Sequence, residues 1–264
     1  MVVESTKENL TMFNRDMLLK LIIPVAIEQT LSVTVGMADM IMVSGAGEAA
    51  VSGISLVNSI SILLVMLFAA LASGGSVVVA QYLGSGNQDK ACRAAEQQVL
   101  SCLLISIGLT VFALVGNRAI LSLIYGSVEE EVMNNAVTYF AIIAISFPFL
   151  AMYNAGAALF RVMNNAHISM IMSAIMNVIN IMANAVFIFY LHMDIAGVAY
   201  ATLLSRMVAA IVLMLQIRRQ SLPVHIDRYF RFHWDSHMMK NILRIGVQQG
   251  LENSMFQICK LLTQ

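Results

Sequence analysis

Residues 17–43, MLLKLIIPVAIEQTLSVTVGMADMIMV, form an apolar run longer than a helix in a soluble core needs. At about 1.5 Å per residue, the run is long enough to cross the hydrocarbon core of a bilayer as one α-helix. Pro24 lies well inside it and predicts a bend, because proline removes a backbone hydrogen bond. Asp39 lies near the far end, where a carboxylate is rarely left facing lipid. A bent first helix that carries one acid indicates a transporter or a channel.

The composition extends this conclusion to the whole chain. Of its 264 residues, 59% are hydrophobic and 11% are charged, whereas soluble domains carry roughly 25% charged residues. Because the apolar runs are long and do not alternate, they predict an all-α membrane protein embedded in a lipid bilayer. The net charge is zero, which gives no reason to expect a nucleic-acid partner. The chain lacks His-Glu-x-x-His and Gly-x-Ser-x-Gly motifs, so we do not expect an enzyme.

Hydropathy divides the chain into six spans and the start of a seventh. The expected spans are 17–43, 51–72, 94–115, 132–158, 168–190 and 197–217. We expect the second span to end at the flexible segment 73–76, Ser-Gly-Gly-Ser. The predicted organisation is an N-terminal segment 1–16, a six-helix lobe 17–217, a hydrophilic linker 218–238 and a truncated helix 239–264.

Basic residues predict the orientation of these spans. Lysine and arginine gather in the N-terminal segment, in the loops after the second and fourth spans, and in the linker, while Arg118 alone falls on the opposite side. Positive loops face the cytoplasm. We therefore expect a multi-pass protein of the cell membrane with a cytoplasmic N-terminus and linker.

The chain also contains an internal repeat. LLKLIIPVAIEQTL, from Leu18, aligns with ILRIGVQQGLENSM, from Ile242, and the polar run Glu-Gln-Thr matches Glu-Asn-Ser. Six spans separate the two copies, so both begin on the same side of the membrane. This arrangement is typical of transporters built from parallel repeats.

Several of these segments resemble the multidrug and toxic compound extrusion (MATE) family of cation-coupled antiporters. The matching pieces, in the family's order, are PVAIEQTL, ADMIMVSGAG, AQYLGSGNQDKA, YFAI, NVINIMANAVFIF and GVAYATLLSR. The resemblance implies twelve helices in two six-helix lobes, of which this chain is similar to the amino-terminal lobe plus the first helix of the second. Gln248 stands where the family's seventh helix usually has proline. The implied activity is export of drugs or organic cations in exchange for H⁺ or Na⁺.

Polar residues from four spans are expected at one depth in the membrane. Asn177, Asn180 and Asn184 follow i, i+3, i+7 and therefore share one helix face. Counting from the span ends places this face, Asp39, Tyr139 and Thr202 in the same half of the bilayer. Because buried polar groups need partners, these side chains predict a common polar pocket.

The family resemblance implies a cation-coupling site in that pocket. Asp39, Asn180, Asn184 and Thr202 match positions that bind or relay the coupling ion, with Tyr139 nearby. Proton-coupled relatives often have a second Asp where this chain has Asn184. A single carboxylate with amide and hydroxyl oxygens suits either Na⁺ or one proton, and no other cofactor is expected. The implied partners are an amphipathic or cationic small molecule and a second six-helix lobe that this chain lacks.

Other interpretations of these residues and of the whole chain stay open at this stage. Asp39 could be an interfacial cap, and the asparagines could serve only to hold helices together. Glu28 is expected to pair with a Lys or Arg, and Arg206 to lie against an Asp or backbone carbonyls, or to snorkel. The alternative functions are a lipid-linked sugar flippase, which needs a strongly basic cavity, and a truncated membrane protein that does not transport.

Overall fold

The computed structural model describes residues 15–43, 47–126, 128–226 and 235–262, which contain helices and no strands. Residues 1–14 of the N-terminal segment and residues 227–234 of the predicted linker therefore lie outside the described residues. The elements are α1 Arg15–Val43, α2 Glu48–Gly84, α3 Gln88–Val115, α4 Asn117–Tyr125, α5 Glu130–Ile145, α6 Phe147–Val162, α7 Ala166–Ala185, a π-helix Val186–Tyr190, α8 Asp194–Ile217 and α9 Ser236–Leu262.

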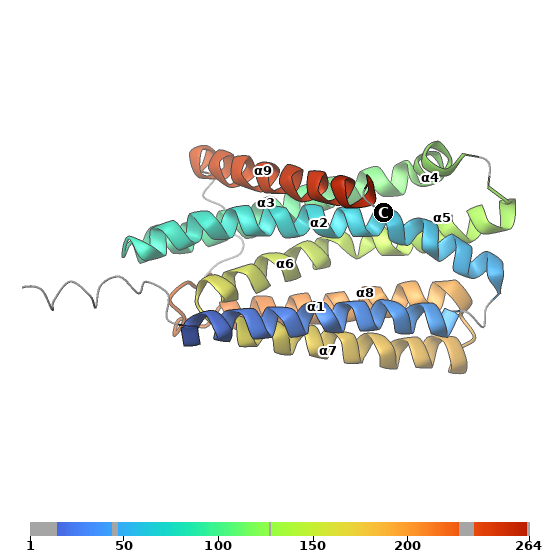
Figure 1. The fold of residues 1–264 in the computed structure, drawn as a ribbon, viewed down its shortest axis with the longest axis horizontal. Helices are drawn as coiled ribbons and strands as arrows, with labels where there is room; N and C mark the ends of the chain where they lie inside the picture. Colours follow the sequence, from blue (N-terminus) through green and yellow to red (C-terminus); the bar gives the residue numbers. More distant parts are fainter. Residues whose placement is uncertain (1–14, 44–46, 127, 227–234, 263–264) are drawn as a thin grey trace, which may run out of the picture.

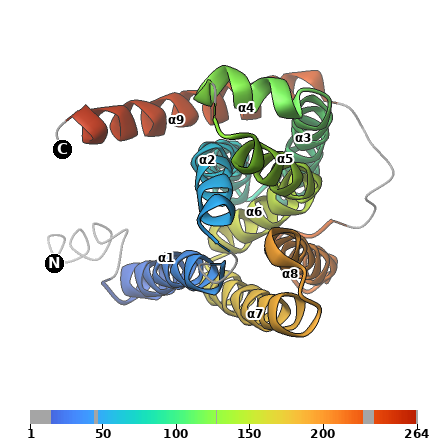
Figure 2. The ribbon, with the colours of Figure 1, turned by 90° about the vertical axis from the view of Figure 1, so that its right-hand side faces the viewer.

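The long helices run side by side in two groups (Figures 1 and 2). One group holds α1, α7 and α8, and the other holds α2, α3, α5 and α6, with α4 and α9 on its outer side. Among the described residues, five helices are long and apolar enough to cross a membrane, and the bent pair α5 and α6, counted as one span, makes a sixth. The structure therefore confirms an all-α membrane protein with six spans before α9.

The second span is longer than predicted. Residues 73–76, expected to end it, lie inside α2, which continues to Gly84. Small residues are needed there because other helices approach closely: a Cβ at Gly74 would overlap the backbone of Gly246, and one at Gly75 would overlap Gln98. Gln98 donates a hydrogen bond of 2.8 Å to the carbonyl of Ala72. Tertiary packing thus keeps this glycine-rich segment helical.

The fourth span, expected as one helix over 132–158, is broken. α5 and α6 meet at Ser146 with a bend of 46°. Pro148 causes this break, because it cannot donate a backbone hydrogen bond to the carbonyl of Ala144. The hydroxyl of Thr110, on α3, donates to that carbonyl instead, at 3.0 Å. The short helix α4 was not predicted, and α3 begins at Gln88, earlier than the third predicted span.

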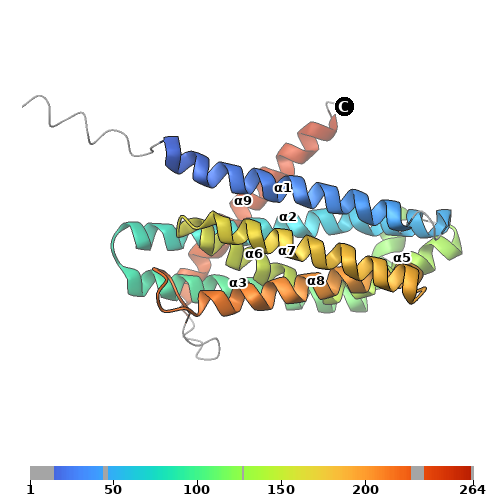
Figure 3. The ribbon, with the colours of Figure 1, turned by 90° about the horizontal axis from the view of Figure 1, so that it is seen from below.

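The two ends of the described chain differ in packing. α9 begins at Ser236, inside the predicted linker, and crosses the other helices at a steep angle (Figure 3). Its first turns are buried, with Met239 and Ile242 both under 10% exposed. α1 instead leaves much of its apolar surface exposed, including Val33 at 60% and Ile41 at 73%. A surface of this kind suits lipid or another helical lobe.

Candidate functional site: a polar pocket between two helix groups

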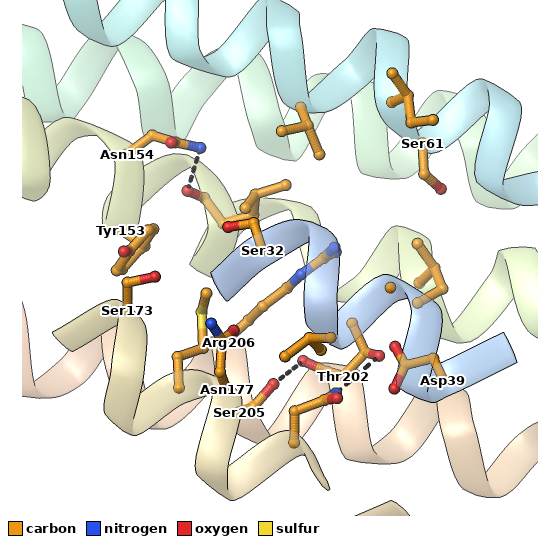
Figure 4. A pocket seen from close by; sticks show the side chains of 18 of the residues that line it. Ser32, Asp39, Ser61, Tyr153, Asn154, Ser173, Asn177, Thr202, Ser205 and Arg206 are labelled. Carbon is orange, nitrogen blue, oxygen red and sulfur yellow. Dashed lines mark hydrogen bonds between the residues drawn. The ribbon is translucent and has the colours of Figure 1, made fainter. Parts of the chain in front are cut away.

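A cavity of about 550 Å³ separates α1 from α2, although these two helices follow one another in the chain. Its volume lies within the range typical of small-molecule pockets. Six helices supply its lining (Figure 4). The polar and charged lining residues are Glu28, Gln29, Ser32, Asp39, Asn58, Ser61, Tyr139, Tyr153, Asn154, Ser173, Asn177, Asn180, Thr202, Ser205 and Arg206.

Four of the predicted site residues form one hydrogen-bonded chain. The amide nitrogen of Asn184 donates to Oδ1 of Asp39 at 2.6 Å and to Oδ1 of Asn180 at 3.2 Å. The amide nitrogen of Asn180 then donates to the hydroxyl oxygen of Thr202 at 3.3 Å. The chain joins α1, α7 and α8 at one end of the pocket. Asp39, Asn180 and Thr202 line the pocket, whereas Asn184 is fully buried beside them.

The other two predicted residues, Tyr139 and Asn177, line the same pocket without joining this chain of hydrogen bonds. Both are buried, at 8% and 6% exposed. The amide nitrogen of Asn177 has no hydrogen-bond partner in the described chain, and neither does the hydroxyl of Ser61 across the pocket. Buried polar atoms without partners in a concave site are available to a ligand or to water.

The hydrogen bond of Asp39 favours a site residue over an interfacial cap. Its side chain bonds to an asparagine on α7 and lies about one turn before α1 ends at Val43. The asparagines do link helices, since Asn180 bonds across to α8. However, Oδ1 of Asn184 is buried without a partner, which a purely structural role leaves unexplained.

The opposite end of the pocket holds the second acid of α1. Glu28, at 8% exposed, accepts hydrogen bonds from Tyr153 at 3.2 Å and from Ser169 at 3.4 Å. Nη1 of Arg161 lies 3.4 Å from Oε2 of Glu28 and completes a salt bridge. The expected pairing of Glu28 with a basic residue is therefore confirmed.

Arg206 lies between the two acids and was not predicted as a site residue. Figure 4 shows its side chain reaching from α8 into the middle of the pocket, with Asp39 on one side and Tyr153 on the other. Nη1 donates to the hydroxyl of Ser146, at the break between α5 and α6, at 2.7 Å. Of the surroundings expected from the sequence, an Asp is present in the same pocket and attracts the guanidinium, while the hydrogen bond goes to a serine hydroxyl. An arginine inside a membrane span is the sequence signal that could have identified this residue.

Pro24 is buried, and α1 continues through it without a break. The residues on both sides of the proline are helical. A bend at Pro24 stays a prediction.

Comparisons with known proteins agree with this architecture. The uncharacterized transporter YisQ of Bacillus subtilis is 26% identical over 245 residues, which cover 90% of this chain and 53% of YisQ. The probable multidrug resistance protein NorM of Thermotoga maritima is 28% identical over 257 residues, covering 92% of this chain and 52% of NorM. A crystal structure of MATE in a bent conformation superimposes with a TM-score of 0.84 at 24% identity, covering 93% of this chain and 54% of that one.

The chain thus spans about half the length of the relatives it matches. The family model described as MatE matches residues 24–186, which include most of α1, all of α7 and every helix between them. On this match, together with the shared fold, the chain is a multi-pass membrane protein that belongs to the MatE family of efflux transporters.

Proposed function

We propose that this chain forms half of a cation-coupled exporter of drugs or other organic cations, with its N-terminus on the cytoplasmic side of the cell membrane. The pocket would hold the amphipathic substrate, and the chain of hydrogen bonds at Asp39 would hold the coupling ion. The names of relatives support the substrate class, since NorM is described as a probable multidrug resistance protein. A second six-helix lobe would cover the pocket from the exposed side of α1.

The observation that carries this proposal is the state of Asp39. It is a carboxylate at the wall of a 550 Å³ cavity, and among the described residues it receives an amide hydrogen bond but no salt bridge. A charge in this position is costly unless something neutralises it. A bound Na⁺ or a proton would do so.

The surrounding atoms fit a small hard cation. Asp39, Asn180, Asn184 and Thr202 together present carboxylate, amide and hydroxyl oxygens, which are the ligands such cations prefer. Oδ1 of Asn184 is already free of other partners. A proton on Asp39 would neutralise the same charge without using the other oxygens. Na⁺ binding would therefore depend on all four residues, whereas proton binding would depend on Asp39.

Coupling requires that the ion bind two conformations with different affinity. α1 supplies Asp39, and its exposed surface shows that few neighbours restrain it on the side away from α7. Because the ion site joins α1 to α7 and α8, occupancy would fix the position of α1 relative to the pocket. Pro24, near the other end, would be the point at which α1 bends.

The flippase alternative fits the pocket less well. A cavity for lipid-linked sugar phosphates needs several basic residues, and this lining contains Arg206 together with two acids. The drug-exporter proposal therefore accounts better for the charges present.

The test is ion-dependent stabilisation of the purified chain. Thermal unfolding of the 264-residue protein in detergent is measured against NaCl, with KCl at equal ionic strength, and again across pH 5.5–8. A ligand at 100 times its dissociation constant stabilises the folded state by about 2.7 kcal/mol. We expect the unmodified chain to be stabilised either by Na⁺ specifically or by a change of pH alone. Either effect on stability should disappear in Asp39→Asn.

Glu48→Gln, at the exposed start of α2, serves as the matched control and should keep the response of the unmodified chain. If Asp39→Asn responds to Na⁺ and pH as the unmodified chain does, Asp39 has no part in ion binding and the proposal fails.

A further inference from the structure

Arg206 is the one cationic residue among those that line the pocket in the described chain. A guanidinium group carries five N–H donors. One hydrogen bond from this group is found, to Ser146 at 2.7 Å, and no described carboxylate oxygen lies within 4.0 Å of it. Arg206 is half-buried and lines the wall of the cavity.

The pocket consequently has two separate charges that form no salt bridge with any described residue. Glu28 is neutralised by Arg161 through the salt bridge of 3.4 Å. Asp39 and Arg206 both face the cavity and do not pair with each other within the 4.0 Å limit of a salt bridge. One negative and one positive group therefore lie apart on the walls of a single cavity.

Such an arrangement is unfavourable in an empty pocket at membrane depth and favourable around a complementary ligand. Unpaired ionised groups in a low-dielectric site are costly, whereas charge-assisted hydrogen bonds there are strong. Arginine in particular binds carboxylates through two parallel hydrogen bonds. The free donors of Arg206 match that geometry.

We propose that Arg206 is a specificity-determining residue that binds the carboxylate of zwitterionic substrates in this pocket. This inference rests on the proposed function and adds a substrate class to it. The cationic end of such a substrate would lie toward Asp39. Its apolar body would lie against the aliphatic wall formed by Ile62, Val65, Met66, Ile143 and Leu150.

A matched pair of fluorescent dyes tests this assignment. Rhodamine 19 carries a free carboxylate, and rhodamine 6G is its ethyl ester, so the two share the same cationic ring system and differ at one group. Binding of each dye to the 264-residue chain in lipid nanodiscs is measured by fluorescence anisotropy, with empty nanodiscs subtracted. The variants are Arg206→Gln and Arg206→Lys, with Arg118→Gln on the exposed face of α4 as the control.

We expect Arg206→Gln to weaken rhodamine 19 binding about tenfold or more, which is the usual effect of losing a hydrogen bond to a charged group. Rhodamine 6G should bind Arg206→Gln at least as tightly as the unmodified chain, because a positive charge leaves a pocket that holds a cation. Arg206→Lys should retain part of the preference, since it keeps the charge without the planar pair of donors. Arg118→Gln should change neither affinity.

Two results overturn the inference while leaving the proposed function intact. Equal weakening of both dyes by Arg206→Gln assigns Arg206 to the structure of the α5–α6 break, and unchanged binding of both dyes shows that it does not touch the substrate. If the unmodified chain binds neither dye, this pocket is not a substrate site, and the failure belongs to the proposed function as well.

Discussion

Glu28 and Asp39 are two acids of the same helix, both facing the same pocket, and their surroundings differ. Glu28 accepts hydrogen bonds from Tyr153 and Ser169 and pairs with Arg161. Asp39 accepts one bond from Asn184, and no salt bridge to it occurs in the described chain. The first carboxylate is neutralised by the protein itself, whereas the second is left for something else to neutralise.

The difference shows that a carboxylate at membrane depth is a weak sign of function until its partners are known. The salt bridge between Glu28 on α1 and Arg161 on α6 is a structural contact, because a cation that bound Glu28 would have to displace Arg161. A carboxylate held by neutral amides keeps its place with or without an ion. We therefore expect changes at Glu28 to affect stability and changes around Asp39 to affect ion binding.

The largest effect that tests this contrast is the loss of stability expected for Glu28→Gln. Removing one partner of a buried pair typically costs several kcal/mol, and solvent screening reduces this where a partner is partly exposed. Since the side chain of Arg161 is 32% exposed, we expect about 1–2 kcal/mol of destabilisation. Thermal unfolding in detergent measures it, and the ion response at Asp39 should be unchanged.

The double variant Glu28→Gln with Arg161→Gln controls for the charge left behind. It should be more stable than Glu28→Gln alone, because no unpaired guanidinium remains. If Glu28→Gln removes the stabilisation by Na⁺ or by pH that is expected to depend on Asp39, then Glu28 takes part in ion binding and the contrast between the two acids is wrong.

A smaller effect is expected when Asn184 becomes a second acid. Asn184→Asp places two carboxylates at a contact that now measures 2.6 Å between nitrogen and oxygen. Adjacent like charges favour retention of one proton, which competes with a bound cation at low pH. The Na⁺ affinity of this variant should therefore rise with pH, by about tenfold between pH 6 and pH 8, which corresponds to roughly 1.4 kcal/mol.

The measurement is Na⁺-dependent stabilisation at several pH values, with Asn134→Asp on the exposed face of α5 as the control. A pH profile identical to that of the unmodified chain would show that position 184 does not face the ion site.

The smallest effect is expected at the far end of the hydrogen-bonded chain. Thr202→Val keeps the shape of the side chain and removes the oxygen that accepts from Asn180 at 3.3 Å. A hydrogen bond of this kind contributes about 1 kcal/mol, so Na⁺ affinity should fall about fivefold. Thr138→Val, exposed on α5, is the control. If Thr202→Val binds Na⁺ as tightly as the unmodified chain, the ion site ends at Asn180. If neither protein responds to Na⁺ and both respond equally to pH, the result favours the proton as the coupling ion.

The grouping of Asp39, Asn180, Asn184 and Thr202 was predictable because helix periodicity and span depth are properties of local sequence. The face shared by Asn177, Asn180 and Asn184 follows from 3.6 residues per turn, and all three are buried in the structure. Arg206 was recognisable from the sequence as an arginine inside a span, but its hydrogen bond to Ser146 was not predictable, since that serine lies at a break in another span. The salt bridge of Glu28 was predictable in kind, although its partner, Arg161, lies far along the chain.

By itself the sequence determined that this protein lies in a membrane, that it has six apolar spans before α9, and which family it resembles. These properties follow from hydropathy and from short motifs, which are contained in contiguous residues. Only the tertiary structure decided that α2 stays helical through Gly74 and Gly75, where Gly246 and Gln98 approach it. It also decided that Glu28 forms a salt bridge, whereas Asp39 and Arg206 line the pocket and form none with any described residue. The reason is physical: helix continuity and charge compensation depend on which distant helices come into contact, and that is settled only when the helices pack.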